Sequence, residues 1–240
     1  MDVEQAGPAA AEIHHDHRNV SGGWLRPSVF GAMDGLVSNF ALIAGVAGGH
    51  ASVHTVRLTG LAGLVAGAIS MATGEYTSVA SQSELVQAEI ASERAEIAAR
   101  PRAEEHELAL LYTRRGLSQE LARQVARELS ADPDQVWKIH AREELGIDPD
   151  ELPSPYLAAG SSFVSFAAGA LLPLLPYLAG AHTIAVSLAV AVVGLLVFGG
   201  LVARITGRSI WFGALRQLAL GAAAAAVTYA IGHAVGAGVG

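Results

Sequence analysis

Carboxylates at helical spacing between residues 84 and 151 could bind a metal cation. This segment holds sixteen of the 22 acidic residues and nine of the 15 basic ones. Glu93 and Glu96 stand three residues apart, which places both on one face of a helix. Like charges on one face repel, and a divalent cation that takes carboxylate oxygens would relieve that repulsion. The alternative is a solvated acidic face that neighbouring arginines partly neutralise, namely Arg94, Arg100 and Arg102.

Further candidate ligands follow along the same segment. After Pro101, Glu104 and Glu107 form an i,i+3 pair, and His140 and Glu144 form an i,i+4 pair. Because the chain contains no cysteine, a bound metal must use oxygen, imidazole or thioether ligands. Fe²⁺, Mn²⁺ and, as a third candidate, Zn²⁺ all accept carboxylates together with one imidazole. We therefore predict a metal site formed by Glu93, Glu96, Glu104, Glu107, His140 and Glu144.

Two more carboxylates lie inside apolar stretches, Asp34 in FGAMDGLVSNF and Glu75 in GAISMATGEY. An ionisable side chain in hydrocarbon costs a few kcal/mol and usually lines an ion path. Met71 precedes Glu75 by four residues, so both point the same way, and a thioether favours a transition ion over Mg²⁺ or Ca²⁺. We predict that Asp34, Met71 and Glu75 line a metal path in which Asp34 exchanges protons for metal. The alternative for Glu75 is that it reaches the membrane interface.

Asn39 follows Asp34 by five residues, which at about 100° per residue places it about 140° around the helix. The two side chains are therefore not required to share a face.

Five apolar runs must position these residues. The mean hydropathy of +0.40 and the hydrophobic content of 52% exclude an average soluble domain. Each run is long enough to cross a bilayer as a helix. The runs cover approximately residues 28–49, 58–82, 156–180, 183–203 and 211–237. Glycine pairs at i,i+4 predict close helix packing, namely Gly31/Gly35, Gly45/Gly49 and Gly63/Gly67.

The segment between the second and third runs predicts three or four short helices. Pro101 interrupts the first, Ser118 can cap the next, and Asp132 with Pro133 opens the last. The expected fold is an all-α integral membrane protein with five transmembrane helices and a cytoplasmic helical metal-binding insertion between helices two and three. We divide the chain into a polar tail (1–25), transmembrane helices one and two (26–83), the insertion (84–152) and transmembrane helices three to five (153–240).

Arginine placement predicts the orientation in the membrane. Arg18 and Arg26 precede the first run, the insertion is rich in arginine, and Arg204 and Arg208 lie between the last two runs. The N-terminus and the insertion should face the cytoplasm, with Arg57 as the exception to the rule. The net charge of -7 argues against a nucleic-acid partner. The Ala-, Gly- and Arg-rich composition indicates a bacterial source, for which the host membrane would be the plasma membrane.

Four stretches resemble the vacuolar iron transporter family: FGAMDGLVSNFALIAGVAGG, LAGLVAGAISMATGEYTSVASQSE, EELGIDPDE and GALLPLLPY. The resemblance covers residues 26–240. It implies a dimeric five-helix transporter that moves Fe²⁺ or Mn²⁺ out of the cytosol against protons, without a prosthetic group. The family's membrane-pathway aspartate and methionine match Asp34 and Met71. Its cytoplasmic metal-binding glutamates match Glu93, Glu96, Glu104, Glu107 and Glu144.

The chain departs from the resemblance at two places. Plant relatives carry a pathway glutamate where this chain has Gly63. The family's cytoplasmic methionine pair reads His140-Ala141 here, and an imidazole makes the site harder and more sensitive to pH. That change would widen the selectivity or shift it toward Mn²⁺ or Zn²⁺. A tail cluster from His14 to His17 offers a weak metal-capture patch, with simple solvation as the alternative.

The leading hypothesis is a proton-coupled divalent metal transporter that removes Fe²⁺ or Mn²⁺ from the cytosol. A membrane-anchored metal sensor or storage protein is the alternative, but it would leave Asp34 and Met71 without a role. A membrane metalloenzyme ranks last because the sequence contains no HExxH, GxSxG or phosphate-binding loop. We therefore expect no enzymatic activity.

Overall fold

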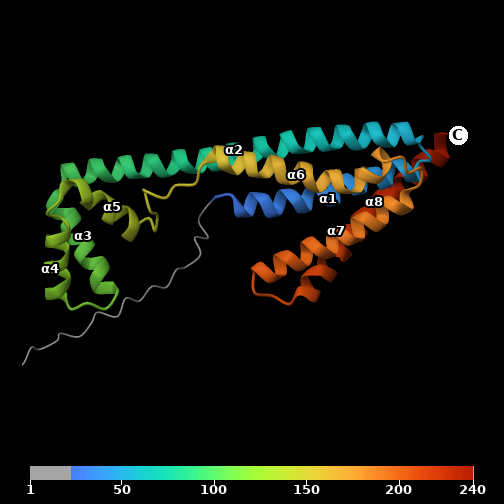
Figure 1. The fold of residues 1–240 in the computed structure, drawn as a ribbon. Coiled ribbons are helices and arrows are strands. Elements are labelled where there is room, and N and C mark those ends of the chain that lie inside the picture. The colour runs from blue at the N-terminus through green and yellow to red at the C-terminus, as the bar shows by residue number, and fades with distance from the viewer. Residues whose placement is uncertain (1–22, 240) are drawn as a thin grey trace, which may run out of the picture.

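The computed structural model describes residues 23–239, which fold as helices joined by short connections and contain no strand (Figure 1). The predicted all-α class is confirmed. Five of the helices are long and apolar enough to span a membrane, namely α1, α2, α6, α7 and α8, as the sequence predicted. The tail cluster His14–His17 lies outside the described residues. The helices are α1 (Leu25–Gly48), α2 (Val53–Ala99), α3 (Pro101–Arg114), α4 (Gln119–Leu129), α5 (Pro133–Glu143), α6 (Pro155–Leu178), α7 (Ile184–Ile205) and α8 (Ile210–Val239).

Helix α2 connects the membrane bundle to the insertion. Its 47 residues span about 70 Å at 1.5 Å per residue, whereas the hydrocarbon core of a bilayer is about 30 Å thick. Only the apolar first part can therefore lie in the membrane, and the rest projects beyond it to α3, α4 and α5 (Figure 1). The boundary predicted between residues 83 and 84 falls inside this continuous helix. Pro101 ends it, because the residue before a proline is disfavoured in helical conformation, and Pro101 then starts α3.

The insertion folds around a small apolar core of its own. Leu108, Ala109 and Ala126 are buried together, and Tyr112 and Ile139 pack against them. The predicted helix starts are also present. Oγ of Ser118 accepts a hydrogen bond from the backbone N–H of Leu121 at 3.3 Å, and Oδ1 of Asp132 accepts one from Asp134 N–H at 2.9 Å. The insertion can thus hold side chains from different helices in fixed relation.

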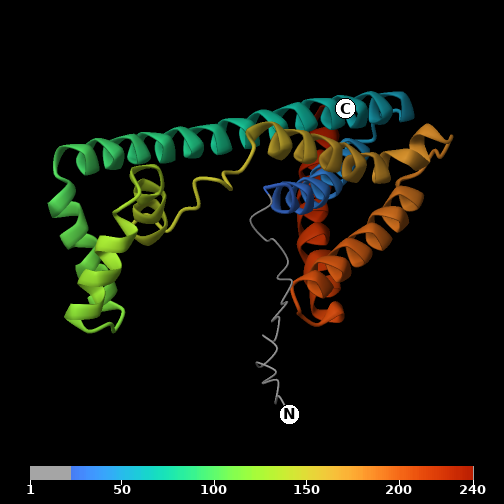
Figure 2. The same cartoon turned by 60° about the vertical axis from the view of Figure 1, so that its left-hand side comes forward.

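Helix α1 lies at the centre of the membrane bundle, in contact with α2, α6, α7 and α8 (Figure 2). Glycines allow the close approach. A Cβ atom at Gly35 would overlap the carbonyl of Phe166 on α6, and one at Gly169 would overlap the carbonyl of Ala32 on α1. A Cβ at Gly45 would lie 3.1 Å from the Thr228 carbonyl oxygen on α8. The glycine spacing seen in the sequence therefore marks real helix contacts.

Helix α6 continues through two prolines to Leu178. At its end, Nε of Arg57 donates a hydrogen bond to the Tyr177 carbonyl at 2.7 Å. The last carbonyls of a helix lack intrahelical partners and carry partial negative charge, so a guanidinium stabilises them. This contact explains why Arg57 departs from the arginine distribution: it caps a helix.

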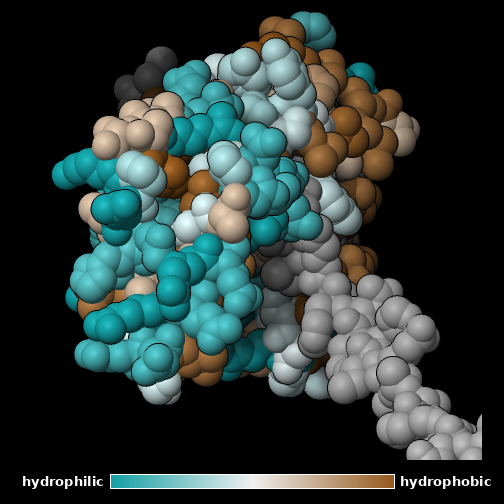
Figure 3. Space-filling model, turned by 90° about the vertical axis from the view of Figure 1, so that its left-hand side faces the viewer, coloured by the Kyte–Doolittle hydropathy of each residue, from teal (hydrophilic) through white to brown (hydrophobic). Residues whose placement is uncertain are grey.

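The two parts of the molecule differ in surface character. The end formed by the insertion is mainly hydrophilic, and hydrophobic surface begins where the membrane helices follow behind it (Figure 3). Large apolar side chains such as Val65, Val193 and Leu220 are exposed on α2, α7 and α8. Such surface suits a lipid environment and identifies the chain as a multi-pass membrane protein.

Candidate metal sites in the insertion and the membrane

Four side chains from three helices converge inside the insertion, and we call them the Glu–His cluster: Glu93 of α2, Glu104 of α3, His140 of α5 and Glu144 at the end of α5. One ligand atom each from Glu93, Glu104 and His140 lies within 4.8 Å of the others. Nδ1 of His140 is 3.0 Å from Oε1 of Glu93 and 2.9 Å from Oε1 of Glu144. Two ligands that share a metal at about 2.1 Å and a right angle are about 3.0 Å apart. The spacing therefore suits a common cation.

The cluster contains buried polar atoms without partners. The His140 side chain is fully buried, and Glu104 is 6% exposed. Nε2 of His140 has no hydrogen-bond partner among the described residues, and Oε1 of Glu93 makes no aligned hydrogen bond despite its proximity to the ring. Buried polar groups are normally paired because leaving them unpaired costs about 1–3 kcal/mol. A cation bound between Glu93 and His140 would satisfy the Glu93 oxygen.

Arginine does not neutralise the Glu–His cluster. The guanidinium of Arg94 stacks over the Trp137 ring at 3.6 Å, and Arg100 pairs with Glu96 at 3.3 Å. Within residues 23–239, no Arg or Lys nitrogen lies within 4.0 Å of a carboxylate of the cluster. The geometry thus disfavours the alternative of an acidic face neutralised by neighbouring arginines.

Burial raises the pKa of two carboxyls of the cluster, those of Glu93 and Glu144. Burial raises the pKa of Glu93, and the nearby charge of Glu144 raises it further, while His140 opposes the shift. Burial also raises the pKa of Glu144, with His140 again opposing and Glu107 adding to the increase. Protons therefore compete with a cation for these oxygens more strongly than they would at a free carboxylate.

Metal binding to the cluster is expected to weaken as the pH falls, because Glu93 and Glu144 take up protons at a higher pH than a free glutamate does. Both folded-state pKa values lie above the unfolded ones. The metal-free fold is therefore most stable when both carboxyls are protonated and loses that stability as the pH rises through the raised pKa values. Titration calorimetry of Mn²⁺ in buffers of different ionisation enthalpy measures the protons released. Equal proton release by the wild type and a Glu93→Gln/Glu144→Gln variant would contradict this assignment.

Two predicted ligands lie outside the Glu–His cluster. Glu96 is exposed and paired with Arg100. Glu107 is also exposed, although its charge is near enough to Glu144 to raise the pKa of that carboxyl. Residues three apart diverge by about 60° around a helix, which is enough for one to face the neighbouring helices and the other the solvent.

Asp34 and Met71 line a common cavity of about 300 Å³ in the membrane bundle. Asp34 comes from α1 and Met71 from α2, and Phe166 of α6 closes one side. Glu75 does not border this cavity. It lies one turn further along α2 toward the insertion and is half-buried. The complete lining is Asp34, Ser38, Asn39, Leu42, Gly63, Gly67, Ser70, Met71 and Phe166.

Comparison with known proteins establishes the family. The model of the VIT family matches residues 25–233. The chain belongs to the VIT family. It is 38% identical over 236 residues to "Vacuolar iron transporter" of Acanthamoeba castellanii, a match that covers 96% of this chain and 86% of that protein. It is 34% identical over 239 residues to "Vacuolar iron transporter 1" of Oryza sativa subsp. japonica, covering 96% and 94%. The resemblance found in the sequence is thus confirmed, and the relatives' names indicate transport rather than catalysis.

The cavity of this VIT-family chain includes a polar residue that the sequence did not single out as a ligand. Asn39 borders it, although it lies about 140° from Asp34 around α1. On α1 the cavity follows positions 34, 38 and 42, and Asn39 flanks that stripe on the side of α6. The signal for Asn39 that the sequence offered was a polar side chain within an apolar span, which often has a functional role.

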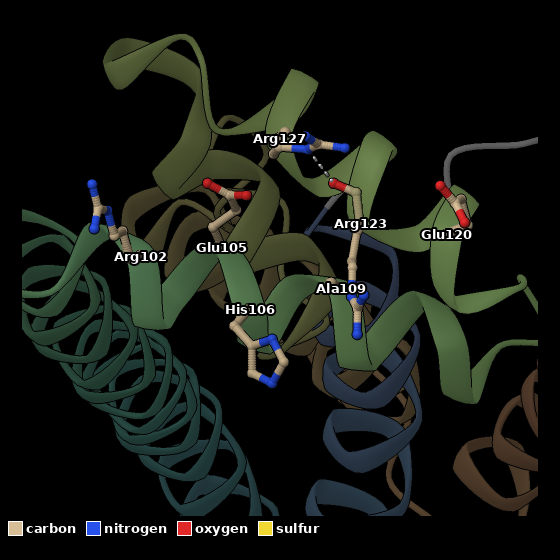
Figure 4. Close-up of a pocket in the computed structure, with 7 residues that line it drawn as sticks. All are labelled: Arg102, Glu105, His106, Ala109, Glu120, Arg123 and Arg127. Carbon is tan, nitrogen blue, oxygen red and sulfur yellow. Dashed lines mark hydrogen bonds between the residues drawn. The ribbon is translucent and has the colours of Figure 1, made fainter.

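A groove of about 540 Å³ between α3 and α4 is a further charged hollow of this VIT-family insertion. Arg102, Arg123 and Arg127 line it together with Glu105 and His106. Their guanidinium groups do not gather at one point, and Arg127 is bonded to the backbone carbonyl of Arg123 (Figure 4). Mixed charge without convergence gives no site for a cation, in contrast to the Glu–His cluster.

Proposed function

We propose that this VIT-family chain moves a divalent metal ion, Fe²⁺ or Mn²⁺, across the membrane in exchange for protons. The observation that carries the proposal is the shared cavity of Asp34 and Met71 within the helix bundle. A carboxylate there can hold either a proton or a cation, and a thioether beside it favours a transition ion. The relatives from Acanthamoeba castellanii and Oryza sativa subsp. japonica are named vacuolar iron transporters, which supports iron as a substrate.

The Glu–His cluster would collect the ion before it crosses. We propose Glu93, Glu104, His140 and Glu144 as the inner ligands. The exposed Glu96 and Glu107 would attract cations to them through their charge. The imidazole of His140 suits Mn²⁺ or Zn²⁺ as well as Fe²⁺. Glu104 also borders a groove of about 550 Å³ that Arg94 and Trp137 line, so one inner ligand is reached from an open hollow.

The direction of transport follows from orientation. The arginine-rich insertion is expected on the cytoplasmic side, where positively charged loops are retained. A collecting site on that face fits removal of the metal from the cytosol. A sensor or storage protein would need the Glu–His cluster alone, and the membrane cavity of Asp34 and Met71 favours transport over that alternative.

We further propose that the chain is a homodimer that associates through α2. Ala62, Ala66, Ser70 and Gly74 form an exposed stripe of small residues at i,i+4 spacing. Apart from its chain neighbours and the backbone of its own helix, no residue of the described chain lies within 4 Å of a Cβ placed at Gly74. Stripes of this kind let two helices approach closely in a bilayer. The stripe adjoins the cavity at Ser70, so the second copy would cover its open side.

Cross-linking tests the dimer directly because the chain has no cysteine. Gly74→Cys protein in membranes is expected to give a covalent dimer with a short bismaleimide reagent. Val197→Cys, exposed on α7, provides the matched control and should remain monomeric. Efficient cross-linking of the control alone would place the interface elsewhere.

Uptake of Mn²⁺ and Fe²⁺ into proteoliposomes of purified protein, with an imposed pH gradient, tests the transport function. We expect gradient-dependent accumulation by the wild type. A sensor would bind the metal without accumulating it inside the vesicles, and that result would refute the proposal.

A further inference from the structure

We propose that Asn39 contributes a neutral oxygen ligand to the transported cation in the membrane cavity. This inference rests on the proposed transport function and adds to it a residue that neither the spacing of the carboxylates nor the family resemblance assigned. It also accounts for Gly63, where a side chain would compete with Asn39 for the same space.

The orientation of the Asn39 amide is fixed by helix α6. Its Nδ2 donates a hydrogen bond to the Ala170 carbonyl oxygen at 2.7 Å. A backbone carbonyl can only accept, so the nitrogen and not the oxygen of the amide must face α6. The oxygen Oδ1 is thereby held on the other side of the amide. The contact decides an orientation that the side chain's shape alone would leave open.

The oxygen so held is buried and unpaired. Asn39 is 2% exposed, and Oδ1 has no hydrogen-bond partner among residues 23–239. An amide oxygen without a partner is costly in a membrane bundle, where solvent does not compensate it. The cavity that Asn39 borders also contains Asp34 and Met71. The residue that carries this unpaired acceptor thus borders the same cavity as a carboxylate and a thioether, and a cation bound between them would pair it.

Gly63 places the Asn39 oxygen on the side of the cavity toward α2. A Cβ atom at Gly63 would lie only 2.9 Å from Oδ1 and 2.6 Å from Cδ2 of Leu42. Any side chain at this position would therefore push against the asparagine oxygen. The Asn39 oxygen can occupy this position because Gly63 has no side chain.

The three groups together make a mixed ligand set. Amide and carboxylate oxygens suit Mn²⁺ and similar hard or borderline cations, and the thioether suits softer ones. Of the three, only Asp34 changes charge on protonation. Asn39 would add an oxygen without adding a negative charge, so it would favour the harder cations without altering the competition between proton and metal at Asp34.

A purely structural role for Asn39, as a link between α1 and α6, gives different results from a ligand role. Loss of a hard oxygen should raise the KM for Mn²⁺ more than the KM for Zn²⁺, because the carboxylate and thioether remain. Loss of a structural link should affect both metals equally or lower kcat alone. The ratio of the two KM values therefore separates the roles.

The test measures Mn²⁺ and Zn²⁺ uptake into proteoliposomes over a range of metal concentrations. For Asn39→Leu we expect the KM for Mn²⁺ to rise on the order of 10-fold, and the KM for Zn²⁺ to rise several-fold less. Gly63→Ala keeps the hydrogen bond to Ala170 but crowds Oδ1, so it should shift the ratio in the same direction. If the Asn39→Leu variant does not fold, the Gly63→Ala variant provides the test. Thr228→Val is the control, since that hydroxyl bonds only within its own helix.

Unchanged KM values, or equal increases for both metals, in the folded variants would overturn the ligand role of Asn39. Failure of the proposed function is a separate result. If the wild type accumulates neither metal, transport itself and the inference that depends on it both fail. If the wild type accumulates them and the variants match it, only the role of Asn39 is lost.

Discussion

Replacing Asp34 by asparagine is expected to abolish pH-driven uptake of Mn²⁺ and Fe²⁺ into proteoliposomes. Asp34 is the one carboxylate that borders the membrane cavity. The amide of the variant has nearly the same shape but cannot exchange a proton for a cation. Metal binding by the Glu–His cluster should be unchanged, because that cluster lies in the insertion. The variant therefore separates collection of the metal from its passage.

Asp150→Asn gives the matched control for that experiment. Asp150 lies in the insertion, where its carboxylate pairs with Lys138 at 2.8 Å, and an exposed pair of this kind contributes about 0–1 kcal/mol. We expect uptake close to that of the wild type. Undiminished uptake by Asp34→Asn would show that the proton and the metal do not exchange at this carboxylate.

The second large effect is expected at Glu104. The Glu104→Gln variant should bind Mn²⁺ on the order of 10–100-fold more weakly. The substitution removes a charged oxygen from the buried Glu–His cluster, which has few other ligands to replace it. Glutamine preserves the volume, so the fold of the insertion should be kept. Equilibrium binding of Mn²⁺ to the purified full-length protein measures the change.

The adjacent Glu105 is the matched control for Glu104. Its side chain lines the outer grooves and not the Glu–His cluster. Glu105→Gln removes the same charge from the same helix, so a general electrostatic effect would weaken binding equally in both variants. Equal losses would mean that the insertion attracts cations by total charge and that the cluster is not a defined site.

Much of this arrangement follows from local rules that the sequence displays. Ser118 and Asp132 begin helices because their side chains accept hydrogen bonds from free backbone N–H groups. Pro101 separates α2 from α3 for steric reasons that need no tertiary contact. Glycine spacing predicts where α1 meets α6, because only a residue without a side chain allows such an approach.

The sequence could not show which of the acidic residues come together in the Glu–His cluster. Glu93 and Glu96 have the same local spacing signals, yet only Glu93 faces His140, because the position of α5 decides which side of α2 is covered. The same reasoning applies to Glu104 and Glu107. Helical periodicity predicts only coarsely on which side of a helix a residue lies. A metal site depends in addition on which neighbouring helix covers that side.

Asn39 shows the same limit inside the membrane. Its angular distance from Asp34 suggested separate faces, but a cavity between two helices is bordered by more than one row of positions. The orientation of its amide depends on Ala170, 131 residues away in the chain. No local pattern encodes such a contact.

The exchange of metal for protons is tested most directly by recording both fluxes in the same vesicles. Purified wild-type protein is reconstituted, and Mn²⁺ uptake and internal pH are followed together with two fluorescent indicators. We expect Mn²⁺ addition to drive proton movement in the opposite direction, and a protonophore that collapses the pH gradient to stop metal accumulation. Mn²⁺ accumulation that continues without a pH gradient and moves no protons would contradict the account.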